Sequence, residues 1–108
     1  MRFDELKSEF KEIGFESLRA DSDDYFEGVI LKDELPKVTD RLGSALGLPV
    51  WPSKEKLLPR VQQAIKEFGG IMPGQTLYFQ AQGSSGALFA MLWPWQDGIH
   101  TTLKIVKK

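Results

Sequence analysis

The sequence TLYFQAQGSSGALFAMLWPWQDGIHTTLKIVK, residues 76–107, contains three segments with the composition of β-strands. They are rich in aromatic and β-branched residues, which favour strands, and run over Thr76–Gln82, from Ala87 to Trp93 or Trp95, and over Ile99–Lys107. They are separated by the glycine- and serine-rich segment 83–86 and by Asp97-Gly98, a pair typical of tight hairpin turns. The stretch therefore predicts an antiparallel three-stranded meander.

An amphipathic helix and two weaker strand signals precede this meander. Four apolar side chains recur at helical spacing near the N-terminus: Phe3, Leu6, Phe10 and Ile13. Gly14 is expected to end this helix in a left-handed conformation, which glycine adopts without a Cβ penalty. Residues 15–20 carry a weak strand pattern, residues 21–24 form an acidic turn, and Tyr25–Leu31 are expected to form a strand. Gly28 marks a β-bulge or a close contact.

Two further helices are predicted between residues 33 and 70. Asp33 is expected to cap the first, with Pro36 tolerated near its start. Its apolar face consists of Leu35, Val38, Leu42, Ala45 and Leu46. Ser53 is expected to cap the second helix, whose apolar face consists of Leu57, Val61, Ala64, Ile65 and Phe68. Pro59 requires either that the regular helix begins near it or that the helix is kinked there.

These elements together predict an α+β fold in one domain spanning residues 1–108. The expected architecture is an antiparallel sheet with the C-terminal three-stranded meander plus one or two earlier strands, and helices packed on the sheet. A chain of 108 residues ordinarily forms one domain. Its apolar content of 42%, with 11% aromatic residues, is enough to build a core, which disordered chains lack.

Charge and composition exclude several classes of protein. Fourteen Lys and Arg against fifteen Asp and Glu leave a net charge of −1, whereas nucleic-acid and anionic-membrane binders normally carry a basic excess. The absence of cysteine excludes disulfide scaffolds, thiol nucleophiles, iron–sulfur clusters and cysteine zinc sites. The first twenty residues carry charges throughout and no apolar run approaches a membrane-spanning length. We therefore expect a cytoplasmic protein without a secretory signal, membrane association or cofactor.

The middle strand of the meander is apolar on both faces, unlike its neighbours. In the two outer strands polar and apolar side chains alternate, so that each has one face for the core. In the middle strand one face carries Phe89, Met91, Trp93 and Trp95, and the other carries Leu88, Ala90 and Leu92. A shift in pairing by one residue exchanges the two faces.

Two registers are compatible with the turns. In the first, Asp97-Gly98 forms a two-residue turn that pairs Leu92 with Leu103, and segment 83–86 forms a two- or four-residue turn that pairs Tyr78 with Met91. This register groups, on the outer face, Phe89, Met91, Trp93, Trp95, Tyr78, Gln80, His100 and Lys104. In the second, residues 96–98 form a three-residue turn with a glycine bulge and the first hairpin shifts likewise. The large residues then face inward and Leu88, Ala90 and Leu92 lie outside.

In both registers the second face of the sheet carries an apolar stripe that needs a cover. Burying each such side chain is worth ~1.5–3 kcal/mol, and large exposed apolar patches usually mark interaction sites. The cover is the N-terminal helix, a second copy of the chain about a two-fold axis, or a ligand or single-stranded nucleic acid stacked on the aromatic rings. The nucleic-acid alternative is the weakest, because its basic edge would be limited to Lys104, Lys107 and Lys108.

No catalytic or metal site is expected. His100 is the only histidine and has no accompanying nucleophile motif or paired carboxylates. The acidic residues Asp21, Asp23 and Asp24 lack the spacing, central glycine and terminal Glu of a calcium loop. Segment 83–86 precedes a strand, whereas a phosphate loop precedes a helix. Trp51 lies between two prolines, and we expect it to plug a gap between helices and sheet or to lie at the rim of a cleft.

The sequence thus predicts a small cytoplasmic, non-enzymatic binding or interaction module that acts through the second face of its meander and forms a homodimer. The predicted binding residues are Tyr78, Gln80, Phe89, Met91, Trp93, Trp95, His100 and Lys104. The alternative is a small-molecule-binding protein or an enzyme whose pocket lies near Trp51, Trp93, Trp95 and His100. A single-stranded nucleic-acid binder is less favoured than either.

Overall fold

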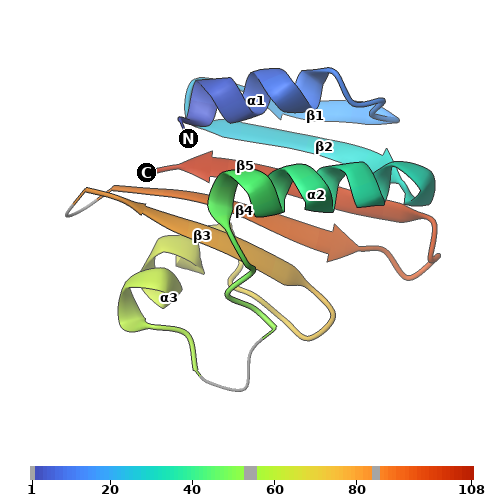
Figure 1. Ribbon diagram of the computed structural model, residues 1–108. Coiled ribbons are helices and arrows are strands. Elements are labelled where there is room, and N and C mark those ends of the chain that lie inside the picture. Colours follow the sequence, from blue (N-terminus) through green and yellow to red (C-terminus); the bar gives the residue numbers. More distant parts are fainter. Residues whose placement is uncertain (1, 53–55, 84–85) are drawn as a thin grey trace.

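The expected α+β fold is confirmed in the computed structural model, which describes residues 2–52, 56–83 and 86–108. Five antiparallel strands form one sheet in the order β1-β2-β5-β4-β3 (Figure 1). The strands are β1 (Ser17–Asp21), β2 (Tyr25–Leu31), β3 (Thr76–Gln82), β4 (Gly86–Pro94) and β5 (His100–Lys107). The helices are α1 (Phe3–Lys11), α2 (Leu35–Leu46) and α3 (Pro59–Ile65), with the 3₁₀ turns η1 (Lys32–Glu34) and η2 (Lys66–Phe68). Strands β3, β4 and β5 are the predicted meander.

Helix α1 forms where the apolar stripe predicts it but ends earlier. The helix stops at Lys11, and the Ile13 N–H donates to the Phe10 carbonyl in a closing turn. Ile13 is buried in the same cluster as the helix. The prediction that Gly14 ends the helix in a left-handed conformation is wrong, because Gly14 does not have a positive φ. The chain has already turned toward β1 before it reaches this glycine.

The starts of α2 and α3 correct one prediction and decide another. Asp33 is not a cap: it lies inside η1, and α2 begins at Leu35 without a side-chain cap hydrogen bond. Helix α3 begins at Pro59, so the first alternative for this proline is confirmed. Proline is tolerated there because the first N–H groups of a helix have no partner within it. The predicted cap Ser53 lies outside the described residues.

Gly28 marks a close contact, and the pairing irregularity of the β1–β2 hairpin lies opposite it, next to its partner Leu18. Strand β2 passes through Gly28 without a break in its pairing with β5. A Cβ placed on this glycine would lie 2.8 Å from Cδ1 of Phe15 and 3.3 Å from Cδ2 of Leu18. The irregularity of the hairpin lies in β1, between Leu18 and Ala20. A glycine here makes room for the Phe15 ring to lie directly on the sheet.

The two hairpins of the meander do not follow the same predicted register. Between β4 and β5, Leu92 pairs with Leu103, as in the first predicted register. Between β3 and β4, Tyr78 pairs with Ala90, one residue away from the predicted partner Met91. The expectation that both hairpins follow one register is therefore wrong. The last β3–β4 pair joins residues 82 and 86 and leaves three connecting residues, whereas the prediction assumed two or four.

This register places different residues on the two faces of the sheet, since side chains of paired residues share a face. On one face, β4 contributes Leu88, Ala90 and Leu92, and the neighbouring strand β3 contributes Tyr78 and Gln80. On the other, β4 contributes Phe89, Met91 and Trp93, and β3 contributes Leu77 and Phe79. We call the face of Phe89, Met91 and Trp93 the second face.

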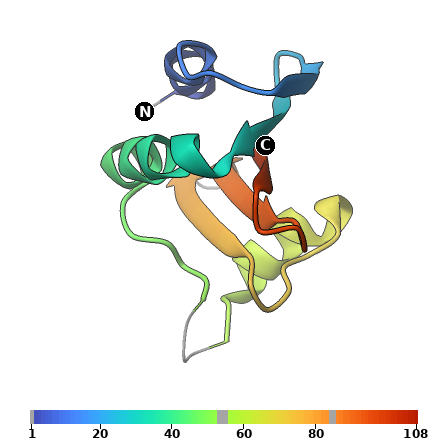
Figure 2. The same ribbon diagram turned by 90° about the vertical axis from the view of Figure 1, so that its right-hand side faces the viewer.

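Helices cover both faces of the sheet, so the core consists of two apolar layers, one on each side of β4. Helices α1 and α2 pack on the face of Leu88 and Ala90, whereas α3 and η2 pack on the second face (Figure 2). The N-terminal helix is therefore a cover of the sheet, but of the face opposite Phe89. None of the helices in the described ranges has the length and apolar character needed to cross a membrane.

Candidate ligand-binding site

The apolar stripe predicted as an interaction surface is largely packed under the chain itself. Phe89 and Met91 are fully buried, and they form a cluster with residues of α3 and with Phe68 of η2. The Phe68 and Phe89 rings meet edge to face, with centroids 5.7 Å apart. Trp93 is half-buried in the same cluster. The second face therefore has an intramolecular cover over most of the predicted stripe.

Tyr78 and Gln80 lie on the opposite face from the tryptophans. Tyr78 is buried in the cluster beneath α1 and α2, and this burial raises the pKa of its hydroxyl. The Gln80 Nε2 donates to the carbonyl oxygen of Ala45 in α2 over 3.4 Å. The structure thus does not bring these two side chains together with the predicted aromatic site.

Lys104 lies on the second face above the Trp93 ring. Its Nζ is 3.5 Å from the ring centroid, a cation–π contact. Partial burial lowers the pKa of Lys104, and the Glu27 carboxylate, paired with it across the strands, opposes that shift. The Tyr25 hydroxyl donates to the same carboxylate, so burial and the Glu27 charge raise the pKa of Tyr25. The Lys104 ammonium thus lies between the Trp93 ring and the Glu27 carboxylate of the neighbouring strand.

Trp95 and His100 lie at the β4–β5 turn, at the far end of the sheet from α3 (Figure 1). Their rings stack with centroids 4.6 Å apart, and the Trp95 Nε1 donates to the Thr102 hydroxyl over 2.9 Å. The His100 Nδ1 is 2.6 Å from the Asp97 carboxylate, and its Nε2 is 2.6 Å from the Glu16 carboxylate. Both ring nitrogens are therefore occupied.

The two carboxylates set the charge of the His100 ring. The hydrogen bond with Asp97, assisted by the negative charge of Glu16, raises the pKa of His100 above its ordinary value. In turn, hydrogen bonds from the backbone N–H groups of Ile99 and His100, and then from the ring, lower the pKa of Asp97 to about 2. Because both ring nitrogens are held by carboxylates, His100 has no free nitrogen to act as a base.

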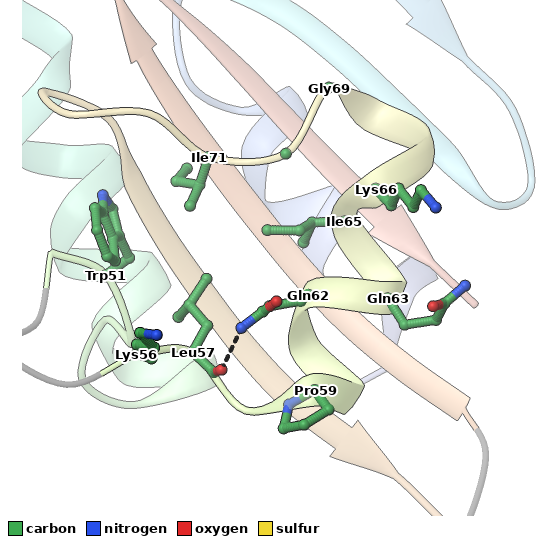
Figure 3. Close-up of a pocket in the computed structure, with 11 residues that line it drawn as sticks. Trp51, Lys56, Leu57, Pro59, Gln62, Gln63, Ile65, Lys66, Gly69 and Ile71 are labelled. Atoms are coloured by element: carbon green, nitrogen blue, oxygen red, sulfur yellow. Dashed lines mark hydrogen bonds between the residues drawn. The ribbon is translucent and has the colours of Figure 1, made fainter.

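A cavity of about 890 Å³ lies beside Trp51, between α3 and the segments that flank it. Figure 3 shows Ile65 of α3, Leu57 and Ile71 extending toward the space in front of the Trp51 ring. Its walls consist of Trp51, Lys56, Leu57, Pro59, Gln62, Gln63, Ile65, Lys66, Gly69, Gly70 and Ile71. This volume lies within the range of small-molecule binding sites.

Local sequence features hold the walls of this cavity in place. The backbone of Trp51 pairs with Leu77 at the edge of β3: the Leu77 N–H donates to the Trp51 carbonyl over 3.1 Å, and the Val50 N–H donates to the Leu77 carbonyl over 2.8 Å. On the opposite side, Gly69 and Gly70 have φ angles of 91° and 70°, which let the chain reverse from η2 into Ile71. The Trp51 wall is thus an extension of the sheet, and the Ile71 wall is a glycine-dependent turn.

The chemistry of these walls suits binding better than catalysis. The apolar part is formed by Trp51, Leu57, Ile65 and Ile71. The Gln62 Nε2 donates to the Leu57 carbonyl over 2.7 Å, which braces α3 against the preceding segment. Among the described lining residues, the charged groups are Lys56 and Lys66, and none is a carboxylate, a histidine or a hydroxyl. The described part of the walls therefore contains lysines and glutamines as its polar side chains, beside the Trp51 ring.

Two tryptophan N–H groups near the cavity have no hydrogen-bond partner. The Nε1 atoms of Trp51 and Trp93 are both shielded and unpaired within the described part of the chain. Trp93 lies close to the cavity wall, since a Cβ on Gly69 would be 3.5 Å from its Cη2 atom.

The acidic residues 21–24 do not form a metal site. Asp21 accepts ion pairs from Lys7 and Lys11 of α1, both at 2.8 Å, and these two lysines lower the pKa of Asp21. Across residues 2–52, 56–83 and 86–108, no group of three or more His, Asp or Glu side chains is arranged to hold a metal ion. Asp21 instead connects α1 to β1.

The four residues of the alternative pocket predicted from the sequence lie at two separate places in the structure. Trp51 lies at the cavity and Trp93 next to it, whereas Trp95 and His100 lie at the far turn. Gln62 and Ile71 carry no sequence signal that marks them as residues of a binding site. The available signals were the proline-flanked Trp51 and the glycine pair at 69–70, which mark both walls without showing that they face each other.

Comparisons of the chain with protein-family models, with curated proteins and with solved structures found no significant match.

Proposed function

We propose that this protein is a small, non-enzymatic binding module that holds a small organic molecule in the cavity beside Trp51. The observation that carries this proposal is the cavity itself, of about 890 Å³, whose walls combine a tryptophan, three aliphatic side chains and a few polar groups. This composition is typical of small-molecule sites, where apolar contact supplies affinity and polar groups fix orientation. The ligand would have an apolar body that packs on Trp51, Leu57 and Ile71.

The packing of the second face favours this cavity over the predicted protein interface. A partner that reached Phe89 or Met91 would have to displace α3, because both side chains are fully buried beneath it. The homodimer and the cytoplasmic location stay predictions. Sedimentation equilibrium from micromolar to millimolar concentration measures the first, and a dimer that survives at micromolar concentration would favour the protein-interaction alternative.

The absence of paired catalytic groups in the described walls supports a non-enzymatic role. A general base needs a nearby proton donor or nucleophile, and the walls supply lysines and glutamines only. His100 lies at the other end of the sheet with both nitrogens engaged. We therefore propose that the cavity binds a molecule but does not catalyse its reaction.

A neutral fluorescent probe tests the proposal directly. N-phenyl-1-naphthylamine is apolar and uncharged, and we expect saturable binding with one site per chain and shifts of the Ile65 and Ile71 methyl resonances. Ile71 is a half-buried wall residue, and the substitution Ile71→Gln should weaken binding of the probe roughly tenfold, since about 1.4 kcal/mol of apolar contact is lost. Ile99→Gln is the matched control, because Ile99 is exposed at the far turn. Equal affinities for the two variants would overturn the proposal.

A further inference from the structure

The charged groups among the described residues that line the cavity beside Trp51 are both positive. The whole chain has fourteen basic and fifteen acidic residues, so its charges are nearly balanced overall. The described walls instead carry Lys56 and Lys66 and no carboxylate. A bound molecule would displace water from these ammonium groups, and a negative charge on that molecule would replace the lost hydration.

Among the residues that the structure describes, the two lysines of the cavity have no carboxylate partner, in contrast to several other lysines. Lys7 and Lys11 bind Asp21, and Lys37 binds Glu34. The carboxylate next to Lys66 in sequence, Glu67, is 3.4 Å from the Lys108 ammonium. Within the described residues, no ion pair or hydrogen bond engages the ammonium group of Lys56 or Lys66. Their charge is therefore available to a ligand.

The two lysines differ in their placement. Figure 3 shows Lys56 beside Trp51 and Leu57 on one wall, whereas the Lys66 side chain extends from α3 away from Trp51. Lys56 is thus next to the apolar surface on which the ligand body would lie. Lys66 is likewise exposed and contributes positive potential from the opposite rim, farther from that surface.

We propose that the ligand of this cavity is an apolar organic anion, with its carboxylate, sulfonate or phosphate group bound by Lys56 and its apolar body packed on Trp51, Leu57 and Ile71. This inference rests on the proposed function, because it names the class of molecule that the same cavity takes. The lysine ammonium donates hydrogen bonds to the anionic oxygens. The apolar walls exclude molecules that are only charged.

A pair of matched probes separates the charge from the apolar body. 1-Anilino-8-naphthalenesulfonate contains the same anilinonaphthalene body as N-phenyl-1-naphthylamine and adds one sulfonate. We expect the sulfonate probe to bind about three- to tenfold more tightly, the range expected for a partly exposed ion pair. The preference should decrease between about 0.01 M and about 1 M salt, over which the screening length decreases from ~30 Å to ~3 Å.

Substitution of the lysine assigns the contact. Lys56→Gln should remove most of the preference for the sulfonate probe and leave the affinity for the neutral probe unchanged. Lys32→Gln is the matched control: Lys32 is exposed, lies in η1 away from the cavity, and has no side-chain ion pair within the described residues. Amide spectra of both variants check that the fold is retained and that the probes shift resonances of α3.

The outcomes distinguish the two proposals. If the neutral probe binds in the cavity as tightly as the sulfonate probe, the proposed function stands and the anionic ligand is overturned. If Lys56→Gln keeps the full preference, the assignment to Lys56 is overturned. If neither probe shifts the resonances of α3, the proposed function is overturned together with the inference.

Discussion

Truncation of Phe89 to alanine is the sharpest test of the two-sided core. Phe89 is fully buried on the second face. Its ring stacks on Phe79 with centroids 6.0 Å apart and meets the Phe68 ring edge to face at 5.7 Å. Phe89→Ala removes both ring pairs and leaves a cavity between β4 and η2, while the other face of β4 keeps all of its contacts.

The expected loss of stability is large for a chain of this size. Phe→Ala substitutions in a core cost about 3–5 kcal/mol, and each aromatic pair adds roughly 0.5–1.5 kcal/mol beyond burial. With two such pairs, Phe89→Ala should lie in the upper part of the range for Phe→Ala substitutions, at about 4–5 kcal/mol. Since small domains are stable by about 5–15 kcal/mol, this variant lies near the limit of folding. Phe89→Leu, with an expected loss of roughly 1–2 kcal/mol, keeps the measurement possible if alanine unfolds the protein.

Urea denaturation followed by tryptophan fluorescence and by circular dichroism measures these differences. Leu88→Ala is the matched variant on the opposite face, where Leu88 is 1% exposed, and should cost about 2–5 kcal/mol. Leu48→Ala is the matched surface control, because Leu48 is 88% exposed, and should change stability by less than about 0.5 kcal/mol. A loss below about 1 kcal/mol for Phe89→Ala, with a full loss for Leu88→Ala, would refute the view that α3 and η2 make the second face a core.

Three further substitutions test single contacts. Gly28→Ala should cost about 1–3 kcal/mol in urea denaturation, because its new Cβ would meet the Phe15 ring at 2.8 Å; an unchanged midpoint would contradict this contact. Because the pKa of His100 is raised above 6.5, its stabilisation is complete below pH 6.5 and is lost as pH rises through the folded pKa. His100→Gln should thus destabilise the protein more at about pH 5 than at about pH 9, and an equal loss at both would argue against the ion pairs with Asp97 and Glu16. The contribution of Asp97 to stability has the opposite pH dependence, because its pKa is lowered from 3.8 to about 2. This stabilisation is present above pH 3.8 and is lost as pH falls toward 2. Asp97→Asn should therefore destabilise the protein at neutral pH but not near pH 2, as measured by urea midpoints.

The sequence by itself determined the elements whose signals are local. The spacing of Phe3, Leu6 and Phe10 predicts α1, and the strand composition around Asp97-Gly98 predicts β4 and β5, whereas their register stayed open between two alternatives until the structure decided it. Such signals need only neighbours within a few residues, because helical spacing and tight turns are set by short-range backbone geometry. The double-sided apolar pattern of β4 also showed correctly that both faces of the sheet need a cover.

Only the tertiary structure decided which segment covers which face and where a cavity remains. The register of β3 on β4 depends on one residue of loop length that composition does not determine, and this residue moves Tyr78 to the face opposite Trp93. The wall of the cavity formed by Trp51 depends on its pairing with Leu77, a contact between residues 26 positions apart. Contacts at such separation depend on how whole elements pack. The apolar faces of α1 and α3 are chemically similar, so the local sequence does not decide which of the two helices lies over Phe89.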